Sequence, residues 1–399
     1  MTTTIDNEQK TLNVPNLRFP EFEGEWEEKR LSDIADLSKG IGISKDQLSA
    51  DGEPCILYGE LYTKYKSETI KEVISKTNID NTKLVKSKAN DVIIPCSGET
   101  AEEIATARCV LKDDVLLGGD LNIIRLHGYD GSFMSYQLNG KRKYDIAKVA
   151  QGVSVVHLYG EHLKNIKTFN PSLNEQKKIA NLLSLLDERI STQNKIIEDL
   201  KKLKSAIIEI EYSSRTKTSS HIGDFIVQTS KRNKDNAIQT ILSISNRQGF
   251  IQQSEQFENR SVASDDTSNY KIVERNSFAF NPARINVGSI ARLATFDRGI
   301  VSPMYICFRT KDNLFPEYLD YYFESKQFFT EIQKRLEGSV RQCLSFEGLC
   351  NIPLSIPTIE VQQQTGKRLS TLAQEIKLEI DFLELLQKQK KFLLHQMFI

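Results

Sequence analysis

The sequence predicts an α+β fold in two similar halves, each a mixed, strand-rich domain followed by one long helix. Three observations predict this organisation. The 399-residue chain repeats itself at a nearly constant offset, each half holds short runs rich in β-branched and aromatic residues, and each half ends in a long heptad-like apolar pattern.

The repeat is visible in the spacing of matched residues. Pro171 and Pro357 each precede a long helical pattern, and they lie 186 residues apart. The same offset matches Asn90 with Asn276, Gly152 with Gly338, and Leu163 with Leu349. One offset that holds over most of each half indicates a tandem duplication.

Each half begins with strand-like sequence. Short β-branched and aromatic runs bounded by Gly, Asn and Asp are typical of strands. They cover 55–63, 91–97, 107–111 and 121–126 in the first half, and 240–245, 277–282, 289–296 and 304–310 in the second. A shorter helical pattern follows in both halves, at 131–150 and 316–336.

The two long helices carry a narrow apolar seam typical of a coiled coil. In the first helix the phase is interpreted as slipping after Gln193. The predicted seam of the first helix consists of Ile179, Leu183, Leu186, Ile190, Ile196, Leu200, Leu203 and Ile207. That of the second consists of Leu369, Leu372, Ile376, Ile380, Leu383 and Leu386.

Two seams in one chain can bury each other, so we expect the helices to pair antiparallel. A rod of ~36 residues is roughly 55 Å long at 1.5 Å per residue. This arrangement predicts one globular domain at each end of the rod and pseudo-two-fold symmetry. The predicted segments are a disordered tail (1–14), a first domain (15–170), a central helix (171–211), a linker (212–220), a second domain (221–356) and a distal helix (357–399).

Composition narrows the class of protein. Lys plus Arg and Asp plus Glu are 53 each, and a zero net charge argues mildly against a dedicated nucleic-acid binder. Neither a transmembrane stretch nor a secretory signal is recognised, which favours a cytoplasmic protein. The six scattered cysteines are interpreted as reduced, buried thiols.

The motifs of catalysis are missing from the sequence. We find no phosphate-binding loop for ATP, no glycine-rich dinucleotide or S-adenosylmethionine turn, and no histidine–cysteine cluster with metal-ligand spacing. His157 lies three residues after Ser154, but this spacing does not define a nucleophile elbow. The chain is therefore predicted to position other molecules without catalysis of its own.

The whole chain resembles the specificity subunit of a type I restriction–modification system. The opening "PNLRFPEFEGEWEEKRLSDIADLSKG" (15–40) is similar to the start of many such subunits. The segment "GVSVVHLYGEHLKNIKTFNPSLNEQKKIANLLSLLDERI" (152–190) resembles their central region, where Pro-x-x-x-Glu-Gln leads into the helix. The distal copy departs from this pattern, because Val361 stands where Glu is expected before Gln362.

The resemblance implies two target-recognition domains that each read one half of a bipartite duplex DNA sequence. It implies that the paired helices set the gap and dock two methyltransferase (modification) subunits, which motor-nuclease (restriction) subunits join. It assigns S-adenosylmethionine, ATP and Mg²⁺ to those partners, so this chain is expected to hold no cofactor and no metal. Because the two halves differ in sequence, the target is expected to be asymmetric.

Arg, Lys, Asn, Gln and Ser in predicted turns are the candidate DNA contacts, since these side chains bind phosphates and base edges. In the first half they are Lys39, Ser97, Arg108, Gln151 and Ser154. In the second they are Lys231, Arg232, Asn233, Arg284, Asn286, Arg292, Arg341 and Gln342.

Two other classes of protein stay open at this point. One is a scaffold whose two interaction domains bind proteins and no DNA, which the zero net charge favours. The other is a single-chain enzyme, such as a nuclease with scattered acidic ligands. Tight, salt-sensitive binding to a split DNA sequence would exclude the scaffold, and DNA cleavage by the protein alone with divalent metal would favour the nuclease.

Overall fold

The computed structural model describes residues 12–152, 155–213, 219–246, 248–253, 266–338 and 342–399. The chain forms two compact units, residues 1–194 with 381–399, and residues 195–380. Two long helices, α7 (Leu173–Ser213) and α12 (Ile359–Gln396), each contribute to both units. No helix within the described ranges has the length and apolarity needed to cross a bilayer.

The first unit contains a five-stranded sheet with the order β2-β12-β8-β10-β5 and a smaller sheet with the order β3-β6-β4-β11-β7. The elements that precede α7 are β1 Glu27–Arg30, α1 Leu31–Ile34, β2 Ala35–Lys39, η1 Lys45–Gln47, β3 Leu48–Ser49, β4 Glu53–Ile56, α2 Glu60–Thr63, β5 Thr69–Ile70, β6 Ser75–Thr77, β7 Val85–Lys86, β8 Asp91–Pro95, β9 Ser97–Gly98, α3 Ala101–Ile104, β10 Arg108–Val110, β11 Leu116–Leu117, β12 Leu121–Leu126, α4 Gly131–Asn139, α5 Lys143–Val149, β13 Val156–His157, α6 Gly160–Leu163 and β14 Lys167–Asn170.

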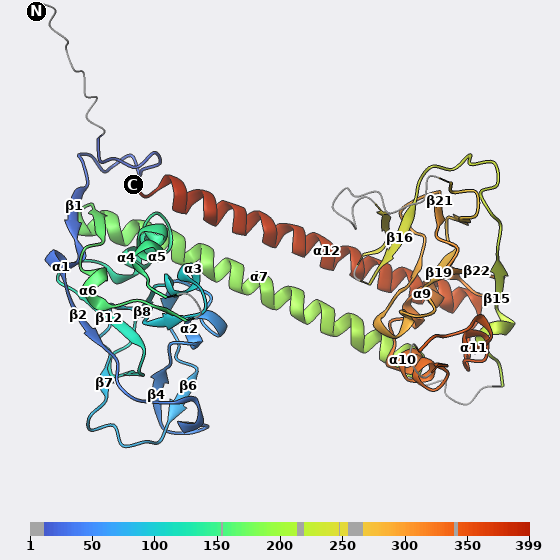
Figure 1. Cartoon of the computed structure of the whole chain (residues 1–399), viewed down its shortest axis with the longest axis horizontal. Helices are drawn as coiled ribbons and strands as arrows, with labels where there is room; N and C mark the ends of the chain where they lie inside the picture. Colours follow the sequence, from blue (N-terminus) through green and yellow to red (C-terminus); the bar gives the residue numbers. More distant parts are fainter. Residues whose placement is uncertain (1–11, 153–154, 214–218, 247, 254–265, 339–341) are drawn as a thin grey trace, which may run out of the picture. The chain divides into compact units, whose positions relative to one another are not determined.

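The central strands of the first unit are buried on both faces. Val92 and Ile124 point to the face that α4 and α5 cover, whereas Ile93 and Ile123 point to the opposite core. This sorting follows from the two-residue period of a strand. Helix α4 lies between the sheet and the long helices, because its Phe133 packs with the beginning of α7 and the end of α12 (Figure 1).

The second unit has a four-stranded sheet with the order β15-β22-β19-β20 and two two-stranded ribbons, β16-β17 and β18-β21. Its elements are η2 Ile222–Asp224, β15 Ile226–Thr229, β16 Leu242–Ser245, β17 Gly249–Gln252, β18 Lys271–Glu274, β19 Phe278–Phe280, η3 Ile285–Val287, β20 Ile290–Arg292, β21 Arg298–Val301, β22 Ile306–Thr310, α9 Pro316–Tyr322, α10 Lys326–Gln333 and α11 Phe346–Cys350.

The duplication is visible in the sheets. The order β2-β12-β8-β10 in the first unit matches β15-β22-β19-β20 in the second. Asn90 and Asn276, matched in sequence, both have positive φ, at 84° and 66°. Gly152 and Gly338 also share positive φ, at 125° and 103°. Asn and Gly tolerate this backbone conformation best, which explains why these residue types recur at the matched turns.

A buried glutamine joins each long helix to its own domain. The Oε1 atom of Gln176 accepts from the N–H of Asp130 at 2.9 Å, where α4 begins. The Oε1 atom of Gln362 accepts from the N–H of Phe315 at 2.8 Å, where α9 begins. Each glutamine also donates to the carbonyl of the proline five residues before it. The two units therefore orient their long helices by the same set of hydrogen bonds.

The departure at Val361 has a structural reason. Glu175, its counterpart, accepts from the Nε and Nη2 atoms of Arg18, both at 2.8 Å, and from the Nε1 atom of Trp26 at 3.3 Å. Both partners lie in the segment that precedes β1. Val361 is 38% exposed.

One predicted strand is wrong in part. Residues 53–56 form β4, but residues 60–63 of the predicted run 55–63 form the helix α2. The carboxylate of Glu60 accepts from the N–H of Leu57 at 3.0 Å and pairs with Lys64 one turn later at 2.6 Å. These polar contacts favour a helical turn where the apolar pattern suggested a strand.

The seam of α7 runs without the predicted phase slip. Gln193 is 3% exposed and continues the seam from Ile190 to Ile197, so a polar side chain holds a buried position. The predicted seam positions Ile196 and Leu203 are wrong, since these side chains are 40% and 50% exposed. The other predicted seam residues are buried or half-buried: Ile179, Leu183, Leu186, Ile190, Leu200, Ile207, Leu369, Leu372, Ile376, Ile380, Leu383 and Leu386.

Within the first unit the two long helices run antiparallel. The beginning of α7, at Ile179 and Leu183, packs with the end of α12, at Met397 and Phe398. The ring of Phe398 lies edge-on to Trp26, with centroids 6.3 Å apart. The end of α12 thus completes the apolar core that α4 and the N-terminal segment begin.

A buried ion network holds the end of α12. The Nζ atom of Lys390 lies 2.5 Å from carboxylate oxygens of both Glu68 and Asp187, and all three side chains are largely buried. Burial raises the pKa of Asp187, but the charge of Lys390 and the hydrogen bonds from Lys390, Ser67 and Tyr136 together outweigh it, and this pKa lies below its usual value. For Glu68 burial prevails over the lysine, and its pKa is raised.

The second unit has a weaker version of this contact. Lys204 precedes Lys390 by the 186-residue offset of the repeat. Its Nζ atom lies 2.7 Å from Glu324, whose side chain is 48% exposed. Water screens an exposed partner, so we expect this pair to contribute less than the buried one.

The variants Lys390→Met and Lys204→Met should therefore differ in stability. Lys390→Met leaves two buried carboxylates without a cation and should lower the free energy of unfolding by about 3–5 kcal/mol. Lys204→Met, the matched control, should cost about 1 kcal/mol or less. Urea titration at neutral pH checks both values, and equal losses would contradict this interpretation.

The loss in free energy of unfolding caused by Lys390→Met should be smaller at acidic pH than at neutral pH. In the wild type, the lowered pKa of Asp187 contributes stability that is lost as pH falls through that lowered value. In the variant, both buried carboxyls should have pKa values above the unfolded value of about 4, so protonation stabilises the folded state. Repeating the urea titrations at decreasing pH measures the change, and a constant deficit would be inconsistent with buried carboxylates.

A fragment that ends after Glu211 should dimerise. It lacks the end of α12 and would expose the apolar surface that Met397 and Phe398 cover on Trp26 and Phe133. Sedimentation velocity should show a dimer, and a fragment that also carries Leu183→Asp should remain monomeric. A strictly monomeric, soluble wild-type fragment would contradict the seam.

Candidate nucleic-acid interface

Three predicted residues of the first unit come together at one polar edge. Strand β9 pairs with β13, which sets Ser97 opposite His157. Gln151 forms a two-way main-chain bridge with the same His157, at 2.9 and 2.7 Å. Lys39 ends β2 opposite Asn122, whose Nδ2 atom donates to the carbonyl of Leu158 at 3.0 Å. Ser97, Gln151 and Lys39 therefore lie around the β9-β13 ribbon, and Ser154 lies outside the described residues.

Two aromatic side chains lie on this edge. The rings of His157 and Tyr159 stack with centroids 6.2 Å apart and an interplanar angle of 24°. Tyr159 is 46% exposed, and exposed rings can stack on bases or sugars. Neither side chain was predicted as a DNA contact: His157 was a candidate for metal binding and catalysis alone, and Tyr159 belongs to no motif of the sequence. In the sequence, the aliphatic Val156 and Leu158 alternate with His157 and Tyr159, and this two-residue period is the signal that could have identified the ribbon.

The second unit repeats the backbone of this edge with different side chains. Cys343 and Glu337 form the bridge that matches His157 and Gln151. The N–H of Leu344 donates to the carbonyl of Pro282 at 3.0 Å, as Leu158 does to Cys96 at 2.8 Å. This bond holds the loop that carries Arg284 and Asn286 against the segment that carries Gln342. Arg284 and Gln342 are exposed, Asn286 is half-buried, and Arg341 lies outside the described residues.

Arg108 does not lie on the surface, contrary to the prediction. Its guanidinium donates to the carbonyls of Tyr65 at 3.2 Å, Ala107 at 2.9 Å and Leu61 at 3.4 Å. The side chain is buried, and this burial lowers the pKa of Arg108. All three of these hydrogen bonds go to the main chain of its own domain, so Arg108 is a structural residue.

Arg292 is likewise engaged within its own domain. Its Nε atom lies 3.1 Å from Asp320, and its Nη1 atom donates to Asn276 at 2.8 Å and lies 3.5 Å from Glu317. The side chain is only 10% exposed. The predicted role of Arg292 in DNA contact is wrong for the same reason as that of Arg108.

Asn233 is buried, whereas its neighbours Lys231 and Arg232 are exposed. Its Oδ1 atom accepts from the N–H of Ile238 at 3.1 Å, and its Nδ2 atom donates to the carbonyl of the same residue at 2.9 Å. Asn233 therefore closes its own loop and is not available to bind DNA. The two basic neighbours are presented by the loop that it closes.

The described part of the chain contains no group of three or more His, Cys, Asp or Glu side chains placed to hold a metal ion. The six cysteines are free thiols, and four of them are buried. Burial raises the pKa of Cys55, Cys96 and Cys307 to about 11 and that of Cys109 to about 12. Cys343 and Cys350 are half-buried.

The chain belongs to the family of type I restriction modification DNA specificity domains. The family model matches residues 23–202 and 223–387, once in each half of the duplication.

A curated relative is the type I restriction enzyme MjaVIII specificity subunit of Methanocaldococcus jannaschii, which is 29% identical over 203 residues. The match covers 51% of this chain and 44% of that protein, so the chain matches less than half of the relative's length.

Two solved structures share the fold. The type I restriction–modification S subunit from M. genitalium aligns over 97% of this chain and 99% of its own, with a TM-score of 0.62 and 17% identity. A chain from a structure of complex assembly and conformational transition in the type I R-M system aligns over 94% and 97%, with a TM-score of 0.52 and 13% identity. These likenesses show that the α+β fold predicted from the sequence is correct.

Burial divides the predicted DNA contacts into residues that support the fold and residues that lie on the surface. Stability measurements can test this division. Arg108→Ala and Arg292→Ala should each lower the free energy of unfolding by about 1–3 kcal/mol, because buried carbonyls lose the donor Arg108 and the half-buried Asp320 and Glu317 lose the cation Arg292. Gln151→Ala and Gln342→Ala should change it by less than about 0.5 kcal/mol. Urea denaturation of the four variants checks this, and a large loss for either glutamine would show that it supports the fold.

Proposed function

We propose that this chain is the DNA-specificity subunit of a type I restriction–modification complex. It reads a bipartite, asymmetric sequence in duplex DNA, and it has no catalytic activity of its own. The observation that carries the proposal is the matched edge of the two units. Equivalent backbone hydrogen bonds hold the segments that carry Ser97 and Gln151 in one unit and those that carry Arg284 and Gln342 in the other. Equivalent backbones that carry different side chains suit two half-sites of different sequence.

The side chains at these edges fit base and phosphate contacts. Arg forms paired hydrogen bonds to guanine, and Gln or Asn does so to adenine. Lys39 in the first unit, and Lys231 and Arg232 in the second, supply charge for the phosphates. Tyr159 adds a stacking surface to the first unit alone. The two target-recognition domains then correspond to residues 15–170 and 221–356.

The outer faces of the long helices support docking of two copies of one partner. Helix α7 exposes Ile196, Leu203 and Ile210, which are spaced by seven residues. Helix α12 repeats the spacing with three exposed side chains, Leu378, Leu385 and Phe392. A seven-residue apolar spacing is the pattern that another helix recognises. In this proposal the two partners are methyltransferase subunits, and motor-nuclease subunits join them for cleavage.

The partners carry the chemistry in this proposal. S-adenosylmethionine binds to the methyltransferase subunits, and ATP and Mg²⁺ serve the motor-nuclease subunits. The complex acts on chromosomal and incoming DNA, so we place it in the cytoplasm. In this proposal the two domains read separate half-sites, and the bases between the half-sites go unread.

The experiment compares genomic methylation before and after deletion of this chain, and then after complementation with variants. Deletion should abolish one split, asymmetric motif. Arg284→Ala with Gln342→Ala should relax one half of the motif, and Ser97→Ala with Gln151→Ala the other, because each base contact contributes about 1–3 kcal/mol. The exposed Gln333→Ala on α10 is the matched control and should restore the original motif.

Two results would contradict the proposal. One is a methylation pattern that does not change on deletion of the chain in a strain whose methyltransferase subunit is active. The other is a complex of this chain with its methyltransferase partner that binds DNA carrying the motif no better than unrelated DNA. The second result would favour a protein-binding scaffold.

A further inference from the structure

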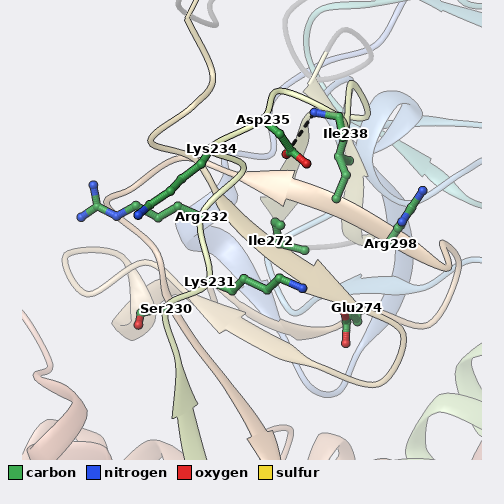
Figure 2. A pocket seen from close by; sticks show the side chains of 10 residues that line it. Ser230, Lys231, Arg232, Lys234, Asp235, Ile238, Ile272, Glu274 and Arg298 are labelled. Carbon is green, nitrogen blue, oxygen red and sulfur yellow. Dashed lines mark hydrogen bonds between the residues drawn. The ribbon is translucent and has the colours of Figure 1, made fainter.

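The second unit has an open cavity of about 750 Å³ beside the β18-β21 ribbon (Figure 2). The loop from Ser230 to Ile238 forms one wall, and the two strands form the other. Four basic side chains line the cavity against two carboxylates, those of Asp235 and Glu274. The basic residues are Lys231, Arg232, Lys234 and Arg298. The cavity therefore carries an excess of positive charge in a chain whose net charge is zero.

The loop that carries three of these cations has a fixed backbone. Asn233 closes it through the two bonds to Ile238 described above, and the N–H of Asn233 donates to the carbonyl of Tyr270 at 3.0 Å. The N–H of Ile272 on β18 donates to the carbonyl of Lys231 at 2.8 Å. Binding at such a loop costs little ordering of the backbone, because the backbone is already held.

The charges of the cavity are open to a ligand. The Oδ1 atom of Asp235 faces its own loop and accepts from the N–H of Ala237 at 3.3 Å. Arg232 donates to the neutral Asn269 at 2.8 Å and so keeps its full charge. Lys231, Lys234 and Arg298 form no ion pair with any side chain in the described ranges. In Figure 2, Arg232 and Lys234 extend to one side of the loop, and Lys231 extends along the strands to the other.

The shape of the site decides which part of a nucleic acid it can take. Base edges lie inside the grooves of a duplex, so only a protruding element can reach them. A concave surface instead receives the protruding sugar–phosphate ridge. Ile238 and Ile272 provide an apolar floor for sugars between the cations. The charge, the hollow shape and the floor together suit a phosphodiester segment.

We infer that this cavity binds the phosphate backbone of the DNA next to the second half-site, with Lys234 and Arg298 as contacts in addition to Lys231 and Arg232. The inference rests on the proposed function and extends it. These residues contribute affinity and position the domain, but they read no base. They differ in this from Arg284 and Gln342, which remain the proposed readers in this unit.

Salt dependence separates phosphate contacts from base contacts. The test variant is Lys234→Gln with Arg298→Gln. The control removes one exposed charge at each end of α10, Lys326→Gln at its first residue with Lys334→Gln just after its last, and α10 lies at the far end of the same unit from β21 (Figure 1). Each variant is assembled with the methyltransferase partner, and its affinity for a duplex carrying the methylated motif is measured over a range of salt concentrations.

The test variant should bind DNA more weakly than the wild type does. The slope of log affinity against log salt should fall by about 0.9 for each phosphate that is no longer neutralised, or about 1.8 for the pair. Its preference for the motif over unrelated DNA should stay that of the wild type. The control should retain the wild-type slope. Thermal melting of both variants checks that they are folded.

Two outcomes would overturn the inference and leave the proposed function intact. One is a folded test variant with the affinity and salt slope of the wild type. The other is a changed methylation motif in cells that carry the test variant, which would assign the residues to base recognition. If the wild-type complex itself shows no salt-sensitive preference for the motif, the proposed function fails first.

Discussion

The packing of the end of α12 into the first unit is the contact on which the rest of the structure depends. Residues 381–399 belong to the same compact unit as residues 1–194, so the last helix completes a core begun at the other end of the sequence. The contacts of Met397 and Phe398 bury apolar surface. The buried Lys390 fixes the position of α12 along its own axis, because its charge is neutralised only where Glu68 and Asp187 contact it. A helix displaced by one turn would leave the two buried carboxylates without the lysine that neutralises them.

The duplication is preserved most closely in backbone-directed hydrogen bonds. Gln176 and Gln362 make matched contacts, and Leu158 and Leu344 anchor matched loops, although little of the surrounding sequence is shared. The side chains that these loops present have diverged freely. Because the hydrogen bonds that hold each domain are repeated and the surface side chains differ, one half can change what it contacts without disturbing how its domain is held.

The sequence was sufficient for the elements with strong periodicity and insufficient where polar residues are buried. The offset between Pro171 and Pro357 predicted the duplication, and the apolar spacing predicted both long helices. The sequence predicted a phase slip after Gln193, yet this glutamine is buried and the seam continues through it in phase. Arg108 and Arg292 fit the chemistry of DNA contact, but their partners are carbonyls and carboxylates distant in sequence. Tertiary contacts of this kind leave no local pattern.

The distribution of the thiols has a practical consequence for labelling. Alkylating reagents attack thiolates at the surface, so the four buried cysteines with raised pKa values should react slowly. The half-buried pair, Cys343 and Cys350, lies in the second unit, and Cys343 is adjacent to Gln342. A maleimide fluorophore would accordingly concentrate in that unit without any engineered cysteine. With Cys350→Ser it would sit at a single position, where its emission would report occupancy of one half of the protein alone.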